Sequence, residues 1–171
     1  MHVVRLLCLA ALAFLSAAPA RAADEIGIDL PACYERVYDQ RHLAEHPQQH
    51  VRAMRLRFYR QPESQTVSAT MNLQFRDGSR RYREPQSTYV AGFICRREQG
   101  RVTCGVECDG GSVALRYSGR NPAEITLDAS EGFAMSPSCP DEDRFERFNP
   151  RPDDRVFRLR RIGADCAIRG E

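Results

Sequence analysis

Residues 67–75 read VSATMNLQF, and every second side chain in this run is apolar. The apolar positions are Val67, Ala69, Met71, Leu73 and Phe75, and polar residues separate them. A repeat of two is typical of an antiparallel strand that buries one face and exposes the other. The run therefore predicts a half-buried β-strand.

The same period of two recurs on both sides of this run. Met54, Leu56 and Phe58 alternate with polar residues in a strand expected from Val51 onward. Beyond the hairpin turn Asp77-Gly78 we expect a polar strand up to Glu84, followed by strands at residues 88–97, 101–108, 112–117, 123–129, 132–135 and 155–162. The proline-rich, acidic residues 136–154 are expected to form a long surface loop.

This succession predicts a mainly β fold, an antiparallel meander of seven to eight strands over about residues 51–162 that forms a small barrel or a sandwich. We favour the barrel, because closure hides the strand edges. One N-terminal helix is expected over about residues 30–45, with Asp29 as its cap, Pro31 in its first turn and Pro47 beyond its end.

Residues 1–22 have the features of a secretory signal peptide. Arg5 precedes an unbroken apolar run over residues 6–15, and the small-residue segment that follows ends in Ala20-Arg21-Ala22. The apolar run is shorter than the roughly 20 residues that a membrane-spanning helix needs. We therefore expect cleavage before Ala23, a single domain over residues 23–171 with no transmembrane segment, and export to the periplasm in preference to full secretion.

The charges of the remaining chain cancel. All 23 acidic residues lie beyond residue 22, whereas two of the 25 basic residues, Arg5 and Arg21, lie before it. Long-range attraction to a polyanion such as nucleic acid needs net charge or a strong one-sided patch. The balance therefore argues against a nucleic-acid partner.

Six cysteines remain after leader removal, and an even number in an exported chain indicates a disulfide framework. A two-residue turn at Gln99-Gly100 would pair Glu98 with Arg101 and, three residues further out, Cys95 with Cys104. This would be a non-hydrogen-bonded pair, in which the two Cα atoms lie about 4.5 Å apart. That separation suits a disulfide. For the other four we expect Cys33 with Cys166, and then Cys108 with Cys139 by elimination.

The string His42-Leu-Ala-Glu45-His46 resembles the HxxEH zinc site of the inverzincin metallopeptidases. On a helix, His42 and His46 would lie one turn apart and could share a zinc ion, with Glu45 activating a water. Pro47 follows at once, however, and histidines near a helix C-terminus are also stabilised by the helix dipole. Zinc therefore enters only as an alternative; the favoured interpretation has no cofactor and no catalytic residue.

Four outward-facing arginines suggest a binding surface. Arg55 and Arg57 on the first strand and Arg158 and Arg160 on the last would become neighbours if those strands closed the barrel, forming a cationic stripe for carboxylate or phosphate groups. The alternative is that acidic residues of the same chain pair with them.

We therefore interpret the chain as an exported, disulfide-stapled β-barrel module that binds an unidentified ligand, envelope polymer or protein partner, and we favour a binding role over an enzymatic one. One alternative is a small zinc-dependent hydrolase that uses His42, Glu45 and His46. The other is a structural or interaction protein of the cell envelope without a small-molecule site.

Overall fold

The computed structural model describes residues 26–76, 82, 88–137, 145–164 and 166. The expected leader at residues 1–22, nearly all of the polar strand expected before Pro85, and Cys139 lie outside these described residues.

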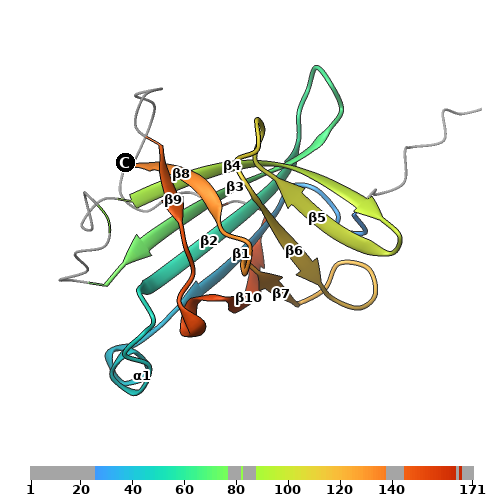
Figure 1. Ribbon diagram of the computed structural model, residues 1–171. Helices are drawn as coiled ribbons and strands as arrows, with labels where there is room; N and C mark the ends of the chain where they lie inside the picture. The colour runs from blue at the N-terminus through green and yellow to red at the C-terminus, as the bar shows by residue number, and fades with distance from the viewer. Residues whose placement is uncertain (1–25, 77–81, 83–87, 138–144, 165, 167–171) are drawn as a thin grey trace, which may run out of the picture.

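Within the described residues the chain forms ten strands, one α-helix and one short 3-10 helix (Figure 1). In chain order these elements are β1 (Ala32–Val37), α1 (Gln40–Glu45), β2 (Val51–Arg60), β3 (Val67–Phe75), β4 (Thr88–Glu98), β5 (Arg101–Gly105), β6 (Ser112–Arg116), β7 (Glu124–Asp128), β8 (Phe133–Pro137), β9 (Glu146–Phe148), η1 (Pro152–Asp154) and β10 (Val156–Gly163).

Eight of the described strands close an antiparallel barrel, which confirms the predicted fold class. β1 to β7 are neighbours in chain order, β10 lies between β7 and β1, and the long β3–β4 ladder completes the ring. The meander is interrupted once, because β8 and β9 form a hairpin that pairs with β4 and crosses the barrel strands in Figure 1.

The barrel interior is filled by alternating apolar side chains. Those of β3 are the residues of the run VSATMNLQF, and Val67, Ala69, Met71 and Leu73 are each 0% exposed. The hairpin of β8 and β9 adds Phe133 and Phe148, which stack on each other and join the same buried cluster. Burial of this apolar surface is the main stabilising term of the fold.

The helix expected over residues 30–45 forms only in its second half. Ala32–Val37 is a strand, and the N-cap is Asp39, whose carboxylate accepts the His42 backbone N–H, instead of Asp29. β1 pairs with β2 on one side and with β10 on the other, and Tyr34 is buried in the core between them. Two long-range ladders thus outweigh a modest local helical pattern.

The segment 136–154, expected to be one loop, carries β9 and η1. Asp154 of η1 is 1% exposed, and its carboxylate accepts the backbone N–H groups of His50 and Val51 at 2.8 and 3.1 Å. The carboxylate therefore holds the start of β2 against the start of β10.

Two disulfides join the pairs expected from the sequence, Cys95 with Cys104 and Cys33 with Cys166. Cys95 and Cys104 are opposite each other in the β4–β5 ladder, inside the barrel, with Gln99 and Gly100 at positive φ in the turn. Cys33 is fully buried between the core residues Ala32 and Tyr34, and it ties β1 to the chain after β10. The expected Cys108–Cys139 pair includes Cys139, which lies outside the described residues.

In the part of the chain that the structure describes, no helix is long and apolar enough to cross a membrane.

Candidate functional site

A pocket of about 420 Å³ opens where β1 and β10 separate. Three residues of β1, Cys33, Tyr34 and Glu35, pair with β10, and the last of these pairs joins Glu35 to Arg160. Beyond this pair β1 continues along β2, and β10 continues along β7. We call the resulting cavity the wedge pocket. Six of its lining residues are Arg36, His42, His46, Asp153, Arg158 and Arg160.

Helix α1 places two histidines on the wall of the wedge pocket. With Asp39 capping the helix, His42 and His46 lie one turn apart, and their rings stack at 4.3 Å between centroids. The His42 ring also stacks on Tyr38 at 4.6 Å. Burial raises the pKa of the Tyr38 phenol, an effect that the nearby Arg36 guanidinium partly offsets, so this phenol is neutral at physiological pH.

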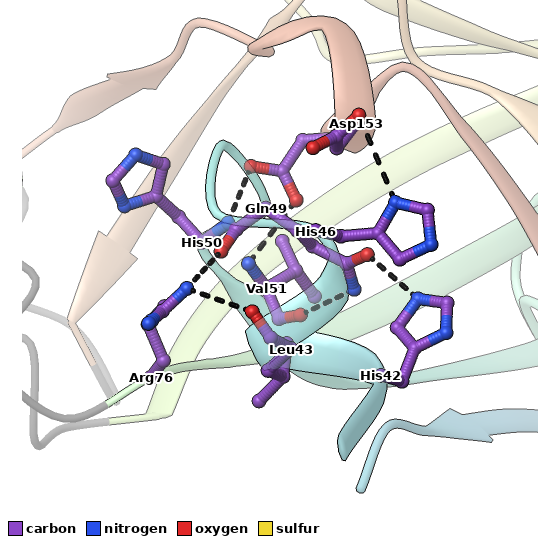
Figure 2. A network of polar contacts seen from close by, with 9 residues as sticks. His42, Leu43, His46, Gln49, His50, Val51, Arg76 and Asp153 are labelled. Carbon is purple, nitrogen blue, oxygen red and sulfur yellow. Dashed lines mark hydrogen bonds and ion pairs between the residues drawn. The ribbon is translucent and has the colours of Figure 1, made fainter. Parts of the chain in front are cut away.

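Gln49 fixes the tautomer of His42. The Gln49 side chain is nearly fully buried, and its amide nitrogen donates to the Val51 carbonyl at 2.9 Å (Figure 2). Its amide oxygen therefore faces His42 Nε2, at 3.1 Å, and accepts a hydrogen bond from it. In the neutral imidazole this leaves the proton on Nε2 and the lone pair on Nδ1.

His46 faces an acid on a different element. Its Nδ1 lies 4.0 Å from the Asp153 carboxylate of η1, and both side chains are partly exposed (Figure 2). The distance is too long for a hydrogen bond but close enough for an ion pair once the ring is protonated.

The three residues of the HxxEH string have separate partners. His42 Nε2 bonds to Gln49, His46 faces Asp153, and Glu45 bonds to Arg41 on the exposed side of the helix. Within the described residues no group of three His, Cys, Asp or Glu side chains could hold a metal ion. A zinc site on this string stays an alternative.

The arginines of the wedge pocket differ in how far they are neutralised. Arg160 Nε lies 4.0 Å from Glu124 of β7. Arg158 is exposed and has no hydrogen-bond or ion-pair partner among the described residues. Arg36 lies over the Tyr38 ring at 4.6 Å, and its buried Nε has no hydrogen-bond partner in the described part of the chain. The wedge pocket thus holds cations available to an anion.

The cationic stripe expected from Arg55, Arg57, Arg158 and Arg160 is divided. The expectation took β2 and β10 as neighbours, but β1 lies between them. Glu35 of β1 ion-pairs with Arg55 and is opposite Arg160 in the ladder, whereas Arg57 lies over the Tyr59 ring. Only Arg158 and Arg160 belong to the wedge pocket.

A second cavity, of about 800 Å³, adjoins α1 on the outer face of β1, β2 and β3. We call it the α1 groove. Its lining residues include Glu35, Tyr38, Arg52, Arg55 and Asn72. Arg52 donates to Gln74 and has no acidic partner in the described ranges, and the buried Asn72 Oδ1 accepts no hydrogen bond there.

The sequence did not reveal Arg36, Tyr38 or Gln49 as site residues. Arg36 and Tyr38 lie in the segment predicted to be helical. In the structure Arg36 is near the end of β1 and Tyr38 follows that strand, an arrangement that a helical prediction does not give. Gln49 follows Pro47 in what reads as a turn, and its burial depends on contacts across the fold. The local signal was a cluster of three histidines and two glutamines within the nine residues 42–50.

No family model, no curated protein and no solved structure matches this chain.

Proposed function

We propose that this protein is an exported, non-enzymatic binding module that takes acidic groups of an envelope ligand into the wedge pocket. The observation that carries the proposal is the meeting of Arg36, Arg158 and Arg160 in one cavity, where the acids among the described lining residues are Glu124 and Asp153. Arginine guanidinium groups match carboxylate and phosphate oxygens in geometry as well as in charge.

Export is supported by the leader-like residues 1–22 and by the two disulfides, since such bonds persist in oxidising compartments. We propose the periplasm as the location. The filled barrel interior favours binding at the outer surface over enclosure of a ligand inside the barrel.

The test measures binding of the mature chain, residues 23–171, to immobilised polygalacturonate and to polyphosphate at low and high salt. The pocket variant is Arg158→Gln/Arg160→Gln. The matched control is Arg96→Gln/Arg101→Gln, which removes two exposed arginines from the β4–β5 hairpin. We expect wild type and control to bind at least one polymer at low salt, and the pocket variant to bind it at least tenfold more weakly.

Equal binding by the pocket variant and the control would contradict the proposal, because charge alone and not this pocket would then account for the attraction. Absence of binding to both polymers at low salt would contradict it as well and would favour a structural or protein-interaction role.

A further inference from the structure

We infer that the ligand is an extended, carboxylate-bearing glycan that runs from the wedge pocket into the α1 groove. The inference rests on the proposed function and extends it to a second binding region. It starts from the contiguity of the two cavities: Tyr38 lines both, and Glu35 of the groove is the ladder partner of Arg160 of the pocket.

Ladder partners in an antiparallel pair lie about 5 Å apart, so the floors of the two cavities meet on the sheet surface. The acid at this junction is already neutralised, since Glu35 pairs with Arg55 through its carboxylate. A chain that crosses here therefore meets little net negative charge.

Each end of this path has a cation without an acidic partner in the described residues. Arg158 lies in the wedge pocket and Arg52 lies in the α1 groove. Between them the path crosses β10, β1 and β2. Two separated guanidinium groups suit a chain that carries several acidic groups better than they suit one small anion.

Asn72 favours a sugar acid over a polyphosphate. Asn72 lines the groove, its Oδ1 is buried without a donor among the residues described, and an unpaired buried acceptor is destabilising. A hydroxyl group can donate to it, whereas an ionised polyphosphate chain has no donor to offer. Arg52, Gln74 and Thr88 in the same groove add further polar groups of the kind that hydroxyls bond.

A peptide ligand is less well matched to this surface. Extended peptides gain their affinity on β-proteins by adding a strand to a free sheet edge. Here β2 pairs on both sides along the groove, with β1 and with β3, so the cavity presents side chains in place of a strand edge. Acidic peptide is therefore an outcome that the test must exclude.

The test compares digalacturonate, a long oligogalacturonate, polyphosphate and poly-glutamate as soluble ligands in calorimetric titrations at low salt. The variants are Arg158→Gln in the pocket, Arg52→Gln and Asn72→Leu in the groove, and Arg101→Gln as the control. We expect the long oligogalacturonate to bind about a hundredfold more tightly than digalacturonate, because linked groups bind at high effective concentration.

Arg52→Gln should weaken the long oligogalacturonate about tenfold and leave digalacturonate binding unchanged, whereas Arg158→Gln should weaken both. Asn72→Leu should weaken oligogalacturonate several-fold and leave polyphosphate unaffected. Circular dichroism of each variant checks that it is folded.

If Arg158→Gln weakens binding but Arg52→Gln and chain length have no effect, the extended-chain inference is wrong and the pocket proposal stands. If Arg158→Gln behaves like Arg101→Gln, both are wrong. Tighter binding of poly-glutamate than of oligogalacturonate would overturn the assignment to a glycan.

Discussion

Glu35 of β1 lies opposite Arg160 of β10, and this is the last pair before the two strands separate. On its other side Glu35 forms an ion pair with Arg55 of β2, while Arg160 faces Glu124 of β7. A row of alternating charges therefore crosses four strands of the barrel. The row neutralises Arg55 and partly neutralises Arg160, and it leaves Arg36 and Arg158, beyond it in the wedge, to act on a ligand.

Removal of the Glu35 charge should strengthen anion binding. Two unit charges about 4 Å apart interact by about 1 kcal/mol in water, which is about a fivefold change in affinity. We expect Glu35→Gln to bind polygalacturonate about fivefold more tightly than wild type at low salt, with a smaller gain at high salt. The control Glu98→Gln removes an exposed acid at the far end of β4 and should change affinity little. Weaker binding by Glu35→Gln would show that the row orders the site.

Loss of the Asp154 carboxylate should destabilise the barrel. It accepts two backbone N–H groups at the start of β2 from a position 1% exposed, and hydrogen bonds to a charged group contribute about 1.5–3 kcal/mol each. We expect Asp154→Ala to lower the free energy of unfolding by about 3 kcal/mol and Asp154→Asn by less. Asp153→Asn, one residue away and more exposed, serves as the control. Urea denaturation measures all three, and equal effects at the two positions would contradict this role.

The barrel was predictable because its information is local. Alternation in residues such as Met71 and Leu73 identifies strands, and the turn at Gln99-Gly100 sets the register that brings Cys95 opposite Cys104. β1 was not predictable in this way. Ala32–Val37 is extended because it pairs with β2, the next strand, and with β10, the last strand along the chain.

The location of the site could not be predicted without β1, the strand that the sequence analysis did not identify. The prediction had no strand at β1, so it made Arg55 and Arg158 neighbours. In the structure β1 lies between their strands, Glu35 separates the two arginines, and a pocket opens beyond Glu35. The histidines were identified from their spacing alone, but their stacking and the orienting bond from Gln49 arise from tertiary packing. Spacing along a helix identifies residues that share a face, not the groups that face them.

The two disulfides should differ in their contribution to stability. Cys33 and Cys166 are 133 residues apart, whereas Cys95 and Cys104 are 9 apart. In the chain-entropy model, closure of the longer loop contributes about 5 kcal/mol and of the shorter about 3 kcal/mol. Alanine pairs are the suitable replacements, because Cys95 and Cys104 are buried among apolar side chains. We expect a larger loss of unfolding free energy for Cys33→Ala/Cys166→Ala in urea denaturation; the reverse order would mean that core packing at Cys95 outweighs loop closure.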